Sequence, residues 1–296
     1  MTDVLMVAHH DRVEAAALAR LAATWLHGHG HSAWMTPEDA EPLDLLDLVS
    51  ERRPESAGLA LSLGGDGTML RTVKMLGGSG VPIIGVNIGL LGYLTEVEPP
   101  ALTAALERWD AGSDAGEWRI EERMMLHAAL RRSGVDRESA QGEIDDTEIW
   151  TALNEAVVEK QEAGHTVRLL VRIDGAPFTS YAADGLIIAT PTGSTAYSLS
   201  ARGPVVSPKH RALLLTPVSP HMLFDRSLVL DPDEEVEIEV IGNRPATLSI
   251  DGQSATSLAE GDTVVVSASV SVARFVRFGE RRFHQILKTK FGLSDR

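Results

Sequence analysis

The pattern of hydrophobic and polar residues changes near residue 99, which predicts a chain of two parts. In the first part, short apolar runs alternate with longer stretches that have helical spacing. The apolar runs predict strands over residues 4–8, 32–35, 59–63 and 81–86. Because strands alternate with helices, we expect right-handed βαβ units and a largely parallel sheet.

The helices expected beside these strands begin and end at recognisable residues. Asp11 is the expected N-cap of an Ala- and Leu-rich helix that ends near Gly28. Three more helices are predicted over residues 42–53, 68–76 and 100–110, and a last amphipathic helix over residues 281–291.

Beyond residue 99 the hydrophobic period becomes two, which is the period of strands. Residues 166–173 alternate in this way and are followed by the turn pair Asp174-Gly175, which predicts a β-hairpin. Asp251-Gly252 marks a second turn. Further strands are predicted over residues 178–182, 236–240 and 264–278, and the polar, acidic segment 133–148 is interpreted as a loop. We therefore expect this part to be antiparallel and rich in strands.

The composition excludes two kinds of partner. The 296 residues include 27 basic and 42 acidic side chains, a formal charge of −15, and no run of Lys or Arg that could bind nucleic acid. No apolar run approaches the roughly 20 residues that cross a bilayer, and Asp3 stands where a signal peptide would carry a basic residue. With 44% hydrophobic residues and no cysteine, we expect a soluble globular protein in the cytoplasm that binds no nucleic acid or membrane.

The candidate chemistry begins at a glycine-rich turn between a predicted strand and a predicted helix. The turn reads Gly64-Gly65-Asp66-Gly67-Thr68, and such a turn exposes backbone N–H groups beside a helix N-terminus, where phosphate oxygens bind. It matches neither a Walker A loop nor a dinucleotide fingerprint. Because a carboxylate repels phosphate, Asp66 binds a metal, orients a hydroxyl or accepts its proton, or else it only caps the turn.

Three later segments add small and polar residues. Asn87 begins the stretch Asn-Ile-Gly-Leu-Leu-Gly-Tyr-Leu directly after a predicted strand, at the sheet edge where open α/β folds bind ligands. Asn154-Glu155 precedes an apolar run. Residues 184–200 form the most unusual stretch, in which a buried strand leads into a loop of hydroxyl residues and glycine beside Tyr197.

Together these motifs resemble those of the bacterial NAD kinases, which phosphorylate the adenosine 2′-hydroxyl of NAD. The glycine motif alone also occurs in diacylglycerol and sphingosine kinases, but the later motifs resemble NAD kinases specifically. Residues 87–94 are similar to the family's N-x-G-x-L-G-F-L, Asn154-Glu155 to its N-E pair, and residues 184–200 to its D-G-x-x-x-x-T-P-T-G-S-T-A-Y-S-x-S signature. The segment 249–253 also has a family counterpart.

The resemblance implies a fold, a reaction and a set of ligands. It implies a Rossmann-like N-terminal α/β domain of residues 1–98 plus 281–296 and a β-sandwich C-terminal domain of residues 99–280, with the active site in the cleft between them. The donor would be ATP or polyphosphate with Mg²⁺ or another divalent cation, and the substrate would be NAD. The partners would be small-molecule nucleotides and copies of the chain in a homodimer or homotetramer. No protein side chain is assigned to the metal.

The resemblance also implies a role for individual residues. Asp66 would be the general base on the 2′-hydroxyl, and Arg71 would contact phosphate. The implied nucleotide-binding residues are Gly64, Gly65, Gly67, Thr68, Arg71, Asn87, Asn154, Glu155, His165, Ala182, Asp184, Thr195, Ala196, Tyr197, Ser198, Ser200 and Gln253.

Two departures and two alternatives accompany this interpretation. Arg202 stands where the family commonly has glycine, and Tyr93 replaces a more frequent phenylalanine. One alternative is a lipid kinase, although in those enzymes an Asn-Glu pair tends to follow the glycine motif almost at once. The other is a sensor that binds pyridine nucleotides without catalysis. The intact glycine loop with Asp66 argues against this alternative.

Overall fold

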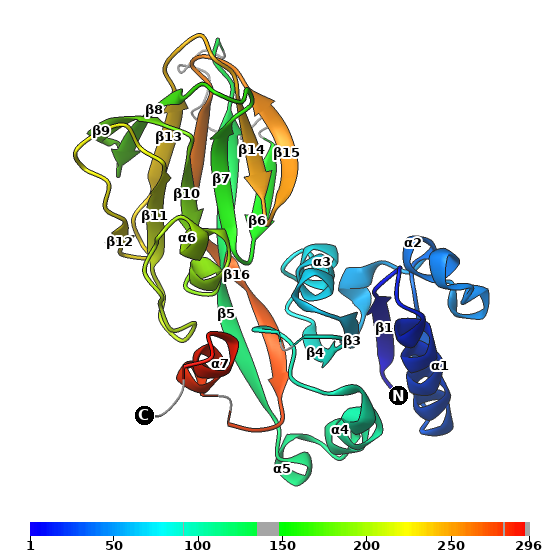
Figure 1. Cartoon of the computed structure of the whole chain (residues 1–296). Helices are drawn as coiled ribbons and strands as arrows, with labels where there is room; N and C mark the ends of the chain where they lie inside the picture. The colour runs from blue at the N-terminus through cyan, green and yellow to red at the C-terminus, as the bar shows by residue number, and fades with distance from the viewer. Residues whose placement is uncertain (91, 135–147, 281, 294–296) are drawn as a thin grey trace. The chain divides into compact units, whose positions relative to one another are not determined.

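The computed structural model describes residues 1–90, 92–134, 148–280 and 282–293. The chain divides into two compact units (Figure 1). Unit 1 comprises Met1–Glu122 and Val272–Arg296, and unit 2 comprises Arg123–Ser271. The predicted loop over residues 133–148 lies almost wholly outside the described residues.

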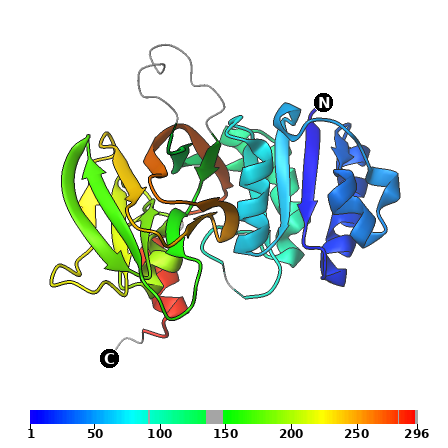
Figure 2. The same ribbon diagram turned by 90° about the horizontal axis from the view of Figure 1, so that it is seen from above.

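Unit 1 contains the predicted parallel sheet. Its strands are β1 (Asp3–Ala8), β2 (Ser32–Trp34), β3 (Leu59–Gly64) and β4 (Pro82–Asn87), in the order β2-β1-β3-β4. All three pairings are parallel, and β1 and β3 run side by side in Figure 2. The predictions of these four strands are confirmed. Burial explains why a strand of this sheet reads as a continuous apolar run. In β3, for example, every residue is buried.

Helices pack on this sheet through small and apolar side chains. The helices of unit 1 are α1 (Val13–Gly28), α2 (Pro37–Ala40), α3 (Asp66–Leu76), α4 (Leu102–Asp110), α5 (Ser113–Gly116) and α7 (Phe283–Lys290). Buried residues of α1 and α4 share one hydrophobic cluster with β1, β3 and β4, whereas α3 packs on β3 and β1. No helix in the described ranges is long and apolar enough to cross a membrane.

Two local predictions in unit 1 are wrong. Residues 42–53 form no α-helix but short 3-10 turns, Glu41–Leu43 and Leu46–Leu48, with a further one at Pro54–Ser56. Asp44 between the first two has a φ of 54°, a left-handed conformation that ends a right-handed turn. Asp11 does not cap α1, because the N-cap is Arg12 and no side chain caps it.

Unit 2 is built from two antiparallel sheets. One contains β8 (Val167–Ile173), β9 (Ala176–Ala183), β13 (Val236–Val240), β6 (Ile149–Ala152) and the unit 2 parts of β5 (Arg119–Arg131) and β16 (Thr263–Arg277). The other has the order β12-β11-β10-β7-β14-β15, with bounds Leu228–Leu230, Leu213–Val218, Gly185–Ala189, Glu155–Lys160, Ala246–Ile250 and Gln253–Leu258. Apolar side chains of both sheets share one core, so the predicted β-sandwich is confirmed.

The division into units differs from the predicted domain boundaries at residues 98/99 and 280/281. Leu102 and Leu106 of α4 belong to the unit 1 core, and Trp118, Ile120 and Phe278 pack against the same core. The first residues of β5 and the last of β16 therefore belong to unit 1, and Arg274 and Phe275 of β16 pair with β4.

Candidate active site

In unit 1, the glycine loop follows β3 without a break. A Cβ on Gly64 would lie 2.1 Å from the Thr68 hydroxyl oxygen, so only glycine fits there. α3 starts within this turn, at Asp66, with Gly65 as its N-cap, and no side chain caps it. The first N–H groups of a helix have no partner within the helix. The turn therefore presents backbone donors at the positive end of α3, as the sequence predicts.

Asp66 stands on the first turn of α3 and is held by the backbone of a neighbouring loop. Its two carboxylate oxygens accept the N–H groups of Tyr93 at 2.8 Å and of Leu94 at 2.9 Å. A Cβ on Gly92 would lie 2.3 Å from Asp66 Oδ1, so glycine is needed at this approach. Asp66 is thus fixed in orientation, and its remaining lone pairs can accept a further proton donor.

Asn87 anchors the loop that holds Asp66. Asn87 is 2% exposed, and its Oδ1 accepts the Thr95 hydroxyl at 3.2 Å. Its Nδ2 donates to the carbonyl of Gly89 and to Glu98 Oε1. Asn87 lies opposite Gly64 in the sheet register, so the glycine loop and the 88–95 loop emerge from adjacent strands. These contacts show that Asn87 has a structural role, because it holds this loop in place.

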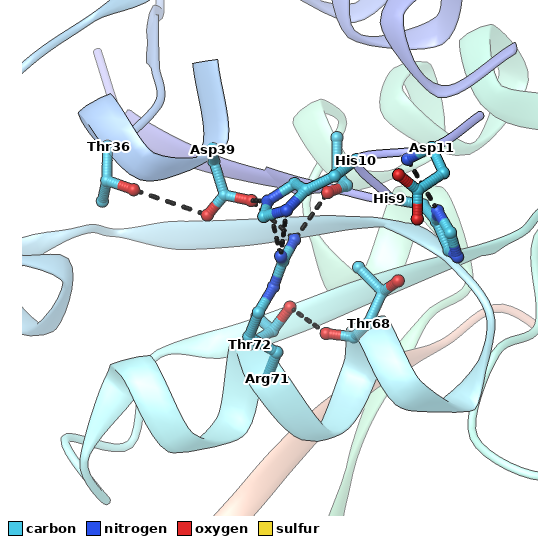
Figure 3. Close-up of polar contacts among 9 residues, drawn as sticks. His9, His10, Asp11, Thr36, Asp39, Thr68, Arg71 and Thr72 are labelled. Carbon is cyan, nitrogen blue, oxygen red and sulfur yellow. Dashed lines mark hydrogen bonds and ion pairs between the residues drawn. The ribbon is translucent and has the colours of Figure 1, made fainter. Parts of the chain in front are cut away.

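Arg71 lies in a compact polar cluster, shown in Figure 3. Its guanidinium contacts Asp39 Oδ1 and the Ala8 carbonyl, each at 2.5 Å, and His10 Nε2 at 2.6 Å. The Asp39 side chain is 3% exposed and also lies 3.0 Å from His10. Arg71 is therefore anchored on one side by a buried carboxylate, and its contact with phosphate stays a prediction.

In unit 2, the Asn154-Glu155 pair stands where β7 begins. Asp251, from the turn between β14 and β15, accepts the backbone N–H groups of Leu153, Asn154 and Glu155 at 2.7 to 3.1 Å. Its own N–H donates to the Glu155 carbonyl at 3.0 Å. Asp251 was not among the predicted site residues. Its position in an Asp-Gly turn, two residues before the predicted Gln253, could have identified it.

Glu155 is a buried carboxyl beside Tyr197. It is 5% exposed, and its Oε2 is buried without a hydrogen-bond partner among the described residues. Burial raises its pKa to about 8, the negative charge of Asp251 adds to this, and a backbone hydrogen bond from Tyr197 opposes it. Burial and the carboxylates of Glu159, Asp184 and Glu155 likewise raise the pKa of the Tyr197 phenol. A buried polar atom of this kind suits a ligand's hydroxyl.

The loop after β10 packs tightly against the same segment. The Thr190 hydroxyl donates to the Leu153 carbonyl at 2.6 Å, and a Cβ on Gly193 would lie 2.1 Å from the Asn154 carbonyl oxygen. Ser198 is fully buried and its hydroxyl lies 3.3 Å from that of Thr216. The short helices Gly193–Thr195 and Tyr197–Ser200 (α6) follow, so the predicted loop is an ordered platform.

The comparisons with known proteins agree on one family. The model of the ATP-NAD kinase N-terminal domain matches residues 4–113, and that of the ATP-NAD kinase C-terminal domain matches residues 153–278. The chain belongs to the NAD kinase family. Its function is therefore that of an NAD kinase, and the lipid kinase and silent sensor alternatives are set aside.

Individual NAD kinases match this chain over most or all of their length. The chain is 41% identical to an NAD kinase of Heliobacterium modesticaldum over 98% of each chain, and 37% identical to one of Acidobacterium capsulatum over all of both chains. Among solved structures, yeast NADH kinase complexed with NADH has a TM-score of 0.86 at 26% identity and covers all of this chain and 89% of its own. An Archaeoglobus fulgidus NAD kinase in complex with ATP shares the fold, with a TM-score of 0.69 at 23% identity over 98% and 96% of the two chains.

The residues predicted from the NAD kinase resemblance fall into two groups. The Gly64 to Thr68 turn and Asn87 lie at the ends of β3 and β4 in unit 1, and Arg71 lies on α3, where it contacts the Ala8 carbonyl at the end of β1. The others lie in unit 2. Among them, Asp184 is paired with Lys160, whose Nζ lies 2.5 Å from Asp184 Oδ1. Ala182 contributes a carbonyl that accepts the His221 N–H at 2.7 Å.

Several predicted residues present their side chains to solvent. His165 and Gln253 are exposed, at the entrance to β8 and at the start of β15, and Ser200 is exposed at the end of α6. Thr195 donates to the Thr192 carbonyl at 3.2 Å, and Ala196 lies between the two short helices. Arg202 is exposed with a φ of 66°, a left-handed conformation that glycine adopts without strain.

Proposed function

We propose that this NAD kinase transfers the terminal phosphoryl group of ATP to the adenosine 2′-hydroxyl of NAD, with Asp66 as the general base. The observation that carries this proposal is the fixed carboxylate of Asp66 on the first turn of α3, directly beside the glycine turn. Phosphoryl transfer needs aligned groups and stabilisation of charge more than covalent chemistry by the protein.

The reaction follows from these positions. The 2′-hydroxyl oxygen attacks the terminal phosphorus, its proton passes to Asp66, and the bond from that phosphorus to the bridging oxygen breaks to release ADP. The backbone donors of the Gly64 to Thr68 turn bind the phosphate oxygens at the N-terminus of α3. The Tyr93 and Leu94 N–H groups keep Asp66 oriented during the transfer.

A divalent cation such as Mg²⁺ fits this arrangement as a companion of the triphosphate. Within the described ranges, no group of three or more His, Asp or Glu side chains could hold a metal ion. We propose that such a cation would bind with the triphosphate and would neutralise charge on the group being transferred. Polyphosphate would suit the same backbone donors, because they bind phosphate without reading a base.

We place NAD against the unit 2 residues that the family motifs mark. Asn154 and Glu155 suit ribose hydroxyls, because a buried carboxyl oxygen without a partner gains a hydrogen bond there. Tyr197, which is 40% exposed, offers a ring face to a base. The cytoplasmic location and the homodimer or homotetramer remain predictions from the sequence.

The test is NADP formation by the purified protein from NAD, ATP and Mg²⁺, measured with an NADP-specific dehydrogenase. We expect product that depends on the donor, with ATP, other nucleoside triphosphates and polyphosphate compared at equal phosphate concentration. Absence of product with every donor, and with NADH as well as NAD, would contradict the proposal.

A further inference from the structure

Asp251 ties down three consecutive residues of unit 2. Its Oδ2 accepts the Leu153 N–H at 2.8 Å, and its Oδ1 accepts the N–H groups of Asn154 at 2.7 Å and Glu155 at 3.1 Å. The N–H of Asp251 completes the set by donating to the Glu155 carbonyl. Hydrogen bonds to a charged acceptor are stronger than neutral ones, so this set is a firm attachment.

The carbonyl side of the same three residues is also occupied. Thr190 binds two of the carbonyls, its hydroxyl that of Leu153 at 2.6 Å and its N–H that of Asn154 at 2.9 Å. The backbone of residues 153–155 therefore has all its donors and acceptors paired. The side chains of this segment are therefore the groups that can bind a ligand. Among the described residues, no hydrogen-bond partner is found for the buried Glu155 Oε2.

We propose that Asp251 is a positioning residue for NAD binding: its carboxylate holds the Asn154 and Glu155 side chains in place through their backbone, and it tunes the charge that Glu155 presents to the nucleotide. The proposal rests on the placement of NAD against Asn154 and Glu155 in the proposed function. Asp251 acts through these two residues, and its own oxygens are occupied by the backbone.

The effect on charge has a defined direction. Burial raises the pKa of Glu155 to about 8, and Asp251 is the next largest cause. The other groups near Glu155 are Tyr197, whose backbone N–H opposes the rise, and Glu159 and Asp184, which lie around the Tyr197 phenol. Lys160 is paired with Asp184. Removing the charge of Asp251 therefore lowers the pKa of Glu155, so that Glu155 ionises at a lower pH.

The chain contains a matched control. Asp174-Gly175 forms the turn between β8 and β9, and Asp174 has a φ of 49°, close to the 47° of Asp251. Asp174 also exchanges two hydrogen bonds with Glu235, which directly precedes β13. Its N–H donates to the Glu235 carbonyl, and its Oδ1 accepts the Glu235 N–H. The predicted NAD residues do not include Glu235.

The experiment is calorimetric titration of NAD into wild type, Asp251→Asn and Asp174→Asn from pH 6 to pH 9.5, with thermal melts to show that each variant folds. In wild type, affinity should rise with pH as Glu155 ionises, because a carboxylate accepts ribose hydroxyls better than a carboxylic acid does. In Asp251→Asn, we expect affinity about tenfold weaker at the highest pH, and the midpoint of the rise about one pH unit lower. Asp174→Asn should match wild type.

The outcomes are distinguishable. Wild-type affinity and midpoint in Asp251→Asn would overturn the inference, and so would a uniform loss of affinity with an unchanged midpoint, since a merely structural defect has that signature. An equal effect of Asp174→Asn would also overturn it. If Asp251→Asn does not fold, Asp251→Ser gives the same test with a smaller neutral side chain. Failure of the wild type to bind NAD would instead contradict the proposed function.

Discussion

The two Asp-Gly turns of unit 2 are nearly the same local structure with different surroundings. Asp174-Gly175 has φ values of 49° and 74°, and Asp251-Gly252 has 47° and 77°. Each aspartate exchanges two hydrogen bonds with the backbone of a glutamate, which is Glu235 directly before β13 for Asp174 and Glu155 at the start of β7 for Asp251. The Glu235 side chain beside Asp174 is 43% exposed, whereas Glu155 beside Asp251 is 5% exposed. The local sequence determines the turn, and the neighbouring strands determine whether it supports a site.

The largest expected difference between these surroundings is steric. Gly193→Ala would place a Cβ 2.1 Å from the Asn154 carbonyl oxygen, which belongs to a backbone that Asp251 and Thr190 hold in place. We expect a loss of about 3 kcal/mol or more in the free energy of unfolding, measured by urea denaturation. Gly175→Ala meets nothing within 4 Å and costs only the strain of its positive φ, about 1 kcal/mol. Equal losses in Gly193→Ala and Gly175→Ala would contradict this prediction, because they would show that the backbone around Asn154 can shift to make room for a Cβ.

The next difference is in the response of stability to pH. The pKa of Glu155 lies near 8 in the folded chain, above its ordinary value of 4.5. Between these values the unfolded chain has released a proton that the folded chain keeps. The free energy of unfolding that this group contributes is therefore fully present below about pH 4.5 and is lost as pH rises through 8.

Glu155→Gln should remove this loss. We expect the fall in the free energy of unfolding between pH 5 and pH 9 to be smaller than in wild type by about 2 to 4 kcal/mol. Glu235→Gln, at the matched position, should leave the fall unchanged because its side chain is 43% exposed. Urea denaturation at each pH measures both. Parallel curves for wild type and Glu155→Gln would contradict the buried, protonated state of Glu155.

The smallest expected effect is that of Asp174→Asn on stability. Asparagine tolerates a left-handed φ, and its side-chain oxygen can still accept the Glu235 N–H. The change in the free energy of unfolding should stay below about 1 kcal/mol by thermal denaturation. Asp251→Asn should cost more, because one of the two positions that accept N–H groups becomes a donor. A larger loss of stability in Asp174→Asn than in Asp251→Asn would contradict the comparison.

Patterns within a short stretch predicted most of the fold. The four strands of unit 1 and the hairpins of unit 2 follow from hydrophobic periods and Asp-Gly turns, which act over a few residues. The predicted helix over residues 42–53 failed because Leu45 and Leu48 have helical spacing and are buried, while Asp44 between turns is left-handed. Nothing in that spacing reveals the φ of Asp44.

The sequence motifs identified candidate site residues where those residues are contiguous in the chain. The Gly64 to Thr68 turn and the loop after β10 are contiguous in sequence, and both form ordered structures. The contacts that hold them come from distant residues: Asp39 and His10 for Arg71, and Asp251 for Asn154. Such pairings depend on the register of strands far apart in the chain, which no local pattern contains.

The most direct test of this account compares Asp66→Asn with Asp251→Asn in steady-state kinetics of NADP formation. The proposed function assigns Asp66 to the reacting hydroxyl, and the further inference assigns Asp251 to the support of the residues proposed to bind NAD. We therefore predict that Asp66→Asn lowers kcat by roughly 10² to 10⁴-fold with little change in NAD affinity. Asp251→Asn should raise KM for NAD and leave KM for ATP and kcat at saturating NAD close to wild type. Near-normal kcat in Asp66→Asn, or the same kinetic change in both variants, would contradict the assignment of chemistry to one aspartate and positioning to the other.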